Sequence, residues 1–186
     1  IAEAMEGEDK AYMDCLNIAG DGIMGVVEIP KIDIKLPIYH TTREDVLQVA
    51  AGHLEGSSLP VGGKSTHCVL SGHRGLPSAR LFTDLDQMEE GDVFVLNVLG
   101  RKLAYEVDQI KVVLPDEMSD LEIVHGKDLC TLVTCTPYGI NTHRLLVRGH
   151  RTKYIEETVV RVQKEAEKKE TGIWLLAGGG AVFLII

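Results

Sequence analysis

Two short segments hold the side chains best suited to chemistry. Residues 71–75 (SGHRG) contain His73, and residues 131–151 (TLVTCTPYGINTHRLLVRGHR) contain Cys135 and Arg144, nine positions apart. If residues 137–142 form the turn of a β-hairpin, Cys135 and Arg144 lie side by side at one rim of a sheet. A thiol, an imidazole and a guanidinium at one rim suit acyl transfer: sulfur attacks a carbonyl, the imidazole moves a proton, and the cation stabilises the oxyanion.

The form of sulfur that attacks is the thiolate, which neighbouring positive charge favours. No Asp or Glu stands in the sequence where it would obviously orient His73, so we expect a Cys/His/Arg site and no Ser/His/Asp-type relay. A second interpretation makes Cys135 a small buried apolar residue and His73 a hydrogen-bonded loop histidine. Spacing alone leaves both interpretations open.

The elements that must position these residues have mostly β character. Apolar and polar residues alternate over 32–38, which predicts a half-buried strand, and the Gly100-Arg101 junction predicts a hairpin turn. Seven or so strands without βαβ alternation predict a closed or nearly closed antiparallel barrel. Short helices are expected at 43–50, behind a capping box from Thr42 to Asp45, and at 79–88. The other strands are expected at 25–29, 66–71, 92–99, 102–114, 129–135 and 144–149.

Composition excludes several classes of protein. With 186 residues the chain suits one core with appendages, and a net charge of −9 opposes binding to nucleic acid. Four cysteines without paired CxxC spacing predict neither a disulfide scaffold nor a zinc ribbon, and we expect no metal and no cofactor. Cys68 and Cys130 each stand five positions before His73 or Cys135, so their side chains should point to the opposite face of the strand.

The two ends of the chain differ from the middle. Residues 1–21 are acidic with a loose helical pattern, and residues 155–172 are a charged connector. Residues 173–186 (IWLLAGGGAVFLII) carry no charge and stop short of the roughly 20 apolar residues of a bilayer-spanning helix. We interpret the chain as a fragment whose parent continues into a C-terminal transmembrane helix; a buried C-terminal helix is the alternative.

Three segments together resemble those of a known family. SGHRG, the 131–151 segment and residues 52–67 (GHLEGSSLPVGGKSTH) are similar to the signature segments of sortases, in detail to the pilin-polymerising class C group. The likeness runs from about residue 22 to residue 154, the expected catalytic domain. It implies an eight-stranded sortase-type β-barrel with short helices, an N-terminal helical segment and a C-terminal helix.

The resemblance also implies roles for single residues. His73 is the catalytic histidine, Cys135 the nucleophile and Arg144 the residue that positions substrate and stabilises the oxyanion. Thr134 and His143 are expected to support substrate binding, and no metal or cofactor is implied. The implied enzyme is a membrane-anchored cysteine transpeptidase on the outer face of a Gram-positive cell. It would cleave an LPxTG-like sorting signal through a thioester and pass the product to a pilin lysine.

One departure and three alternatives accompany this resemblance. Class C sortases usually carry an Asp-Pro-aromatic lid, whereas the first proline here is Pro30, and Asp14-Cys15-Leu16 is a weak substitute. Residues 1–21 are still expected to be lid-like. The alternatives are a sortase that anchors single proteins to cell-wall peptide amines, a hydrolytic cysteine peptidase, and a non-catalytic β-barrel binding module.

Overall fold

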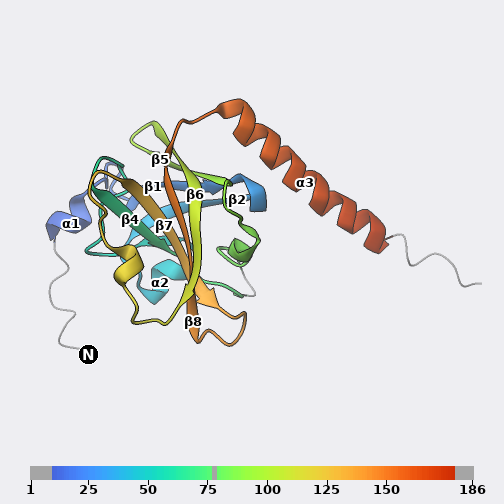
Figure 1. The fold of residues 1–186 in the computed structure, drawn as a ribbon, viewed down its shortest axis with the longest axis horizontal. Coiled ribbons are helices and arrows are strands. Elements are labelled where there is room, and N and C mark those ends of the chain that lie inside the picture. Colours follow the sequence, from blue (N-terminus) through green and yellow to red (C-terminus); the bar gives the residue numbers. More distant parts are fainter. Residues whose placement is uncertain (1–9, 77–78, 179–186) are drawn as a thin grey trace, which may run out of the picture.

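Eight strands close into one barrel in the computed structural model, which describes residues 10–76 and 79–178 (Figure 1). The order around the barrel is β1-β2-β3-β4-β7-β8-β6-β5, and β5 pairs with β1 to complete it. The predicted closed, mostly β barrel is therefore confirmed. The strands are β1 (Ile23–Ile29), β2 (Ile34–His40), β3 (Ala51–His53), β4 (Thr66–Ser71), β5 (Val93–Val98), β6 (Arg101–Val113), β7 (Asp128–Thr136) and β8 (His143–Thr152).

The expectation of a purely antiparallel barrel is wrong. β2 pairs with β3 in parallel, and so does β4 with β7. Alternation of period two reports which face of a strand is buried, but it carries no information on strand direction. The parallel β4–β7 pair brings the SGHRG and TLVTC segments together although 62 positions separate them in the chain.

The barrel interior holds a continuous apolar core. Ile38, Leu70 and Leu132 are wholly buried, and the rings of Phe94 and Tyr105 stack at 5.6 Å between centroids. The strand expected at 32–38 begins only at Ile34, because Asp33 before it adopts a left-handed conformation with φ +49°. The missed strand β3 is only three residues long, too short to show a periodic pattern.

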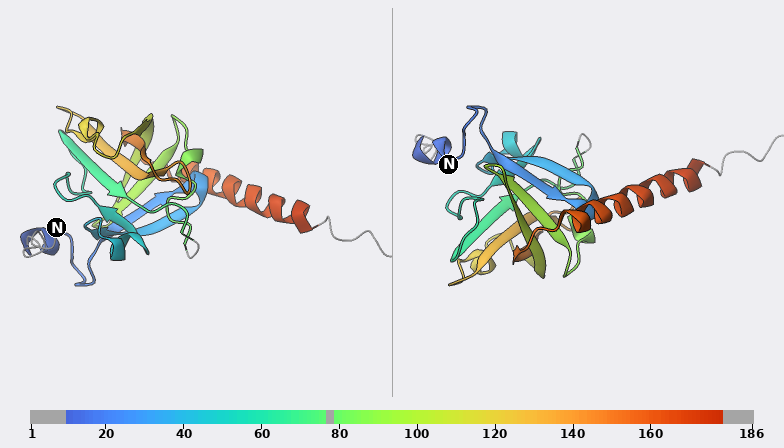
Figure 2. Two further views of the ribbon diagram at one scale, coloured as in Figure 1. Left: turned by 90° about the horizontal axis from the view of Figure 1, so that it is seen from below. Right: turned by 90° about the horizontal axis from the view of Figure 1, so that it is seen from above.

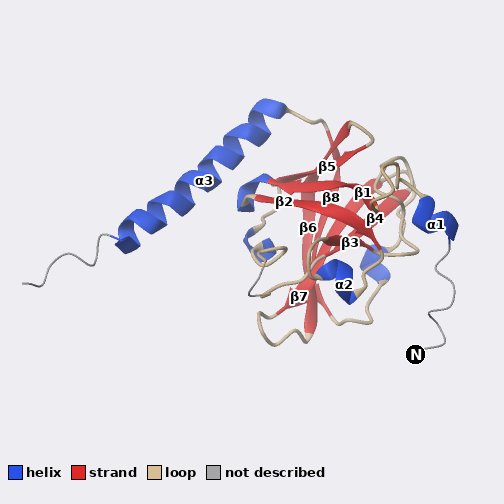
Figure 3. Ribbon diagram, turned by 180° about the vertical axis from the view of Figure 1, so that it is seen from behind, coloured by secondary structure: helices blue, strands red, loops and turns tan. Residues whose placement is uncertain are grey.

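The helices expected at 43–50 and 79–88 are shorter than predicted or absent; Figure 3 shows the helices in blue. α2 spans only Glu44–Leu47, and its N-cap is Arg43 without a side-chain cap, so the expected capping box from Thr42 is wrong. In place of a helix at 79–88 the described residues form turns and a 3-10 turn, η3 (Leu85–Gln87). The amide of Phe82 there donates to the carbonyl of His73, which ties this segment to the end of β4. The other 3-10 turns are η2 (Pro30–Ile32) and η4 (Ser119–Leu121).

The N-terminal segment contains α1 (Lys10–Asp14), which packs through Tyr12. The Tyr12 hydroxyl lies 2.9 Å from His53 Nδ1 and accepts a hydrogen bond from the Thr41 amide at 3.0 Å. Residues 1–9 of the expected lid-like segment lie outside the described residues. In residues 10–21 no hydrogen bond or ion pair reaches His73. The lid therefore stays a prediction.

The C-terminal helix α3 (Glu156–Gly178) leaves the barrel at the side away from α1, as both views in Figure 2 show. Its first turns pack on the barrel through Val159, beside Val95 and Ala104. Within residues 10–76 and 79–178, no helix has both the length and the apolar run needed to cross a bilayer. Residues 179–186 of the expected membrane segment lie outside the described chain.

Candidate active site

Cys135 and Arg144 face each other across two neighbouring strands. They are direct partners in the antiparallel β7–β8 ladder, in which Thr136 also pairs with His143. Residues 137–142 form the connecting turn, so the predicted hairpin is confirmed. Side chains of directly opposed residues lie on the same face of the sheet, so the thiol and the guanidinium share one side of the hairpin.

His73 lies directly after β4, on the other side of β7. Ser71 pairs with Val133, and the Gly72 amide donates to the Val133 carbonyl at 3.0 Å. One residue beyond His73, Arg74 Nη1 donates to Thr136 Oγ1 at 3.4 Å. The pairs Ser71–Val133 and Arg74–Thr136 are each 62 positions apart, and they stand before and after His73 in the chain. The His73 segment therefore runs alongside Cys135. All three predicted catalytic residues therefore come from adjacent chain segments at one rim.

The four cysteines have different environments. All are free; Cys135 and Cys15 are half-buried, whereas Cys68 and Cys130 are buried in the core. The burial of Cys68 and Cys130 confirms that they point into the barrel. Cys135 is therefore the accessible thiol at the rim, which a nucleophile requires.

Thr134 is buried directly beneath this rim. Its side chain is 2% exposed, and its hydroxyl donates to the Gly72 carbonyl at 2.8 Å. Phe82 packs under Gly72 so closely that a Cβ there would lie 2.7 Å from the ring. Thr134 thus holds the residue before His73 in place. Its predicted role in substrate binding stays a prediction.

Arg144 is held at the end of the hairpin by main-chain oxygens. Its Nη1 donates to the carbonyls of Asn141 at 3.2 Å and His143 at 3.0 Å. Among the described residues no carboxylate forms an ion pair with Arg144, so its charge stays available to an oxyanion. The His143 ring is half-buried and contacts the Thr142 hydroxyl at 2.9 Å.

Arg74, the arginine of the SGHRG segment, joins two loops of the site. It forms an ion pair with Asp86 and lies over the Tyr138 ring at 5.8 Å from its centroid. Gly75, with φ +79°, lies against the same ring, where a Cβ would come within 2.9 Å. Arg74 was not predicted as part of the site, although its place beside His73 in the motif was a signal.

A carboxylate does contact the histidine, contrary to our expectation. Both oxygens of Glu44 lie 3.1 Å from His73 Nε2. The hydrogen bond with His73 lowers the pKa of Glu44 below its usual value, and a hydrogen bond from Gln48 lowers it further. No sequence signal could reveal the pair, because α2 reaches the site only through the folding of the β2–β3 connection.

A cavity of about 160 Å³ opens beside Arg144. Its walls come from β4, β7 and β8, from the end of β6 and from the β6–β7 loop (residues 114–127). Its lining is mostly apolar with a few polar groups, as is usual for ligand pockets. The lining residues from the strands are Val69, Ser71, Val113, Val133, Arg144 and Leu146, and those from the loop include Leu114, Met118 and Leu121.

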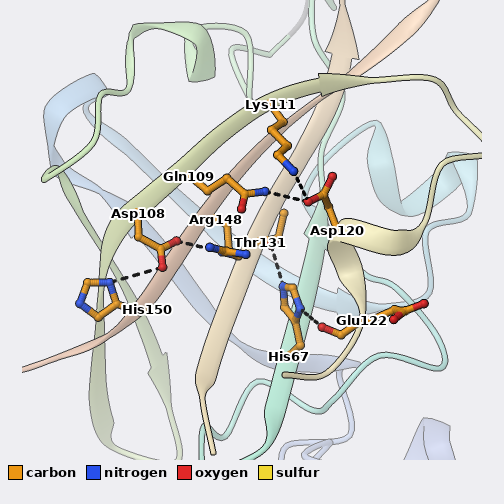
Figure 4. A network of polar contacts seen from close by, with 9 residues as sticks. All are labelled: His67, Asp108, Gln109, Lys111, Asp120, Glu122, Thr131, Arg148 and His150. Carbon is orange, nitrogen blue, oxygen red and sulfur yellow. Dashed lines mark hydrogen bonds and ion pairs between the residues drawn. The ribbon is translucent and has the colours of Figure 1, made fainter. Parts of the chain in front are cut away.

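The β6–β7 loop is fixed by the polar network in Figure 4. His67 Nδ1 donates to the Glu122 carbonyl at 2.9 Å, and His67 Nε2 lies 2.7 Å from Thr131 Oγ1. Asp120 accepts hydrogen bonds from Gln109 and Lys111. Burial lowers the pKa of His67, which keeps its ring neutral between these partners. One wall of the cavity is therefore rigidly attached to the barrel.

Comparison with known proteins identifies the family. A sequence model of the Sortase domain matches residues 27–152, a span that includes His73, Cys135 and Arg144. The chain belongs to the sortase family. Sortases are cysteine transpeptidases of the Gram-positive cell envelope that act on LPxTG-type sorting signals. The resemblance to sortases predicted from the SGHRG and TLVTC segments is confirmed.

Solved sortase C structures resemble this sortase throughout the barrel. Sortase C1 from Streptococcus agalactiae is 57% identical with a TM-score of 0.78, covering 81% of this chain and 80% of that chain. Sortase C-1 from Actinomyces oris is 51% identical with a TM-score of 0.75, covering 78% and 79%. The likeness to class C sortases is thereby confirmed.

Curated relatives are more distant. Sortase D of Bacillus subtilis (strain 168) is 33% identical over 130 residues, which are 68% of this chain and 63% of that protein. Sortase A of Bacillus anthracis is 30% identical over 148 residues, covering 80% of this chain and 69% of that protein. The chain thus spans less than two thirds of the Bacillus subtilis relative.

Proposed function

We propose that this sortase is a pilin-polymerising transpeptidase. It cleaves an LPxTG-like sorting signal with Cys135, holds the product as a thioester, and passes it to a pilin lysine amine. The observation that carries the proposal is the direct pairing of Cys135 with Arg144 while the His73 segment runs along the other side of Cys135. A nucleophile, a proton carrier and a free cation at one point are what acyl transfer needs.

In the first half-reaction the Cys135 sulfur, having given its proton to His73, attacks the carbonyl carbon of the signal's threonine. The carbonyl oxygen becomes an oxyanion, and the Arg144 guanidinium stabilises it, since no described carboxylate neutralises that guanidinium. When the C–N bond to glycine breaks, His73 returns the proton to the leaving nitrogen. The product is a thioester and a free amine.

The second half-reaction reverses these steps with a new amine. The acceptor lysine nitrogen attacks the thioester carbonyl, His73 takes the proton that this nitrogen loses, and the C–S bond breaks. The proton then returns to sulfur, so that the enzyme is regenerated and an isopeptide bond remains. A neutral amine is the required acceptor, and His73 is again the group that moves the proton.

The cavity beside Arg144 suits the sorting signal. It is lined by Arg144, by β4, β7 and β8 and by the fixed β6–β7 loop, so a peptide bound in it would lie next to the residue that stabilises the oxyanion. Thr134 and His143 support this arrangement from the two strands of the hairpin, Thr134 through Gly72 and His143 from its place opposite Thr136.

The choice of a pilin lysine over a cell-wall peptide amine is supported by the likeness to sortase C structures. One of them, from Streptococcus pneumoniae, is 57% identical with a TM-score of 0.71 and is described in terms of catalysis and pilin substrate specificity. We further propose that residues 173–186 begin a single-pass membrane anchor. This anchor would hold the barrel on the outer face of the membrane.

The test is to incubate the protein with a sorting-signal peptide and to search by intact mass for an acyl adduct on Cys135. Cys135→Ala should abolish both the adduct and cleavage. His73→Ala and Arg144→Ala should lower turnover about 100-fold or more with the fold retained, as removal of acid–base and oxyanion groups does. Cleavage by the Cys135→Ala protein would refute the assignment. A purified pilin and a wall peptide, offered in turn as acceptors, would then separate pilus assembly from wall anchoring.

A further inference from the structure

The contact between Glu44 and His73 joins helix α2 to the segment that follows β4. Glu44 lies in the first turn of α2, between β2 and β3, and its two carboxylate oxygens are each 3.1 Å from His73 Nε2. Gln48, one turn later, donates a hydrogen bond to Glu44 Oε1 at 3.4 Å and so restrains the carboxylate. This arrangement is a carboxylate aimed at one nitrogen of the catalytic ring.

A carboxylate on Nε2 determines where the ring carries its proton. An ionised carboxylate only accepts hydrogen bonds, so Nε2 must be the protonated nitrogen and Nδ1 the free acceptor in the neutral ring. No hydrogen bond from the described residues reaches His73 Nδ1. Nδ1 is therefore available to the thiol of Cys135 and to the substrate nitrogen.

We propose that Glu44 is a positioning residue for the sortase reaction: it fixes the tautomer and orientation of His73 and stabilises its charged form. The proposal rests on the roles assigned to His73 and Cys135 above. When the Sγ–H bond of Cys135 breaks, Nδ1 takes the proton and the ring becomes an imidazolium whose Nε2–H still points at Glu44. When the C–N bond of the substrate breaks, Nδ1 gives this proton to the leaving nitrogen, and the neutral ring returns.

The charges around His73 explain why a carboxylate is useful there. Arg144 faces Cys135 across the β7–β8 ladder, and a guanidinium at the site disfavours a second positive charge there. Arg74 is offset by its ion pair with Asp86, but Arg144 has no such partner among the described residues. Glu44 supplies negative charge to the imidazolium directly.

The test compares Glu44→Gln with Glu44→Asp and with a control on the same helix, Asp45→Asn. Asp45 is the neighbouring carboxylate, and it pairs with Arg43 instead of His73. We expect Glu44→Gln to lower kcat about 10-fold with KM within about twofold. The loss is smaller than the 10²–10⁴-fold of removing the acid–base group itself, because Glu44 is exposed to solvent. Glu44→Asp should recover part of kcat, and Asp45→Asn should match the natural enzyme.

A spectroscopic measurement separates positioning from a merely structural role. In protein labelled with 15N-histidine, the His73 ring, assigned by comparison with His73→Gln, should show a protonated Nε2 and a bare Nδ1 at neutral pH. A glutamine amide can donate as well as accept, so Glu44→Gln should mix the two tautomers while the melting temperature stays unchanged.

Unchanged kcat and unchanged ring nitrogen shifts in Glu44→Gln would overturn the inference, and so would an equal loss in Asp45→Asn. Neither result touches the proposed function, which depends on the Cys135→Ala experiment. If Cys135→Ala still cleaved the peptide, the proposed function would fail whatever Glu44→Gln does.

Discussion

The hydroxyl of Thr134 connects the buried barrel to the catalytic rim, and its removal should affect both stability and turnover. Thr134→Val keeps the shape of the side chain but deletes the 2.8 Å hydrogen bond to the Gly72 carbonyl. Because Thr134 is only 2% exposed, water cannot easily replace the lost partner. The carbonyl directly before His73 is then left without this donor.

The expected cost follows from this geometry. A buried polar group that loses its partner costs about 1–3 kcal/mol, and about 2 kcal/mol corresponds to a fall in Tm of roughly 4–8 °C in a domain of about 150–250 residues. The end of β4 should also loosen, which displaces the His73 ring. Since a displacement of about 1 Å can cost on the order of 100-fold, a smaller one should lower kcat about 10-fold. Thermal melting and peptide cleavage measure the two effects.

Thr131→Val is the matched control. Thr131 lies on the same strand and is equally buried, but its hydroxyl contacts His67, remote from the rim. It should lower Tm by a similar amount and, by loosening the β6–β7 loop, should raise KM, while kcat stays within about twofold. The reasoning would be refuted if Thr134→Val lowered Tm but kept full kcat, or if Thr131→Val lost as much kcat. Either result would mean that the hydrogen bond to Gly72 does not determine the position of His73.

Two further predictions concern the neighbouring loops. Gly75→Ala should lower both Tm and kcat, because its Cβ would meet the Tyr138 ring at 2.9 Å. Gly56→Ala is the control for backbone strain alone, since Gly56 has φ +88° and open space around it. Equal kcat losses in the two variants would contradict the role of the Tyr138 contact. Burial lowers the pKa of His67 in the folded protein below its ordinary 6.5. As pH falls, the His67 ring is therefore protonated in the unfolded chain before it is protonated in the folded one, so the free energy of unfolding should fall below about pH 6.5. Denaturant titrations from about pH 7.5 to about pH 5 should show this slope, and His67→Gln should reduce it; an identical slope in that variant would remove His67 as its source.

The chemistry of the site was largely predictable from the sequence, since a hairpin of known length has a fixed register. Once residues 137–142 are taken as the turn, Cys135 must oppose Arg144, and the structure has this pairing. Period two also predicted most strands and the burial of Cys68 and Cys130. Local patterns succeed here because they depend only on neighbours along the chain.

Features that depend on the closure of the barrel were not predictable. The parallel pairing of β4 with β7 joins segments 62 positions apart, and alternation in each strand would look the same in an antiparallel pair. The expected helix at 79–88 was wrong for a related reason. The bond from Phe82 to the His73 carbonyl and the burial of Phe82 under Gly72 determine that segment, and they override its helical propensity.

Glu44 illustrates where a catalytic prediction from motifs must stop. Cys135 and Arg144 lie on β7 and β8, and His73 follows the end of β4, all strands that the barrel holds in register. Glu44 belongs to none of these strands. It lies on the four-residue α2, which the parallel β2–β3 crossover places at the same rim, so its contact with His73 depends on a connection and not on a ladder. A carboxylate placed by a connection can be lost or moved without disturbing the strands. Variation at position 44 should therefore tune the rate of acyl transfer while leaving the nucleophile and the oxyanion site intact.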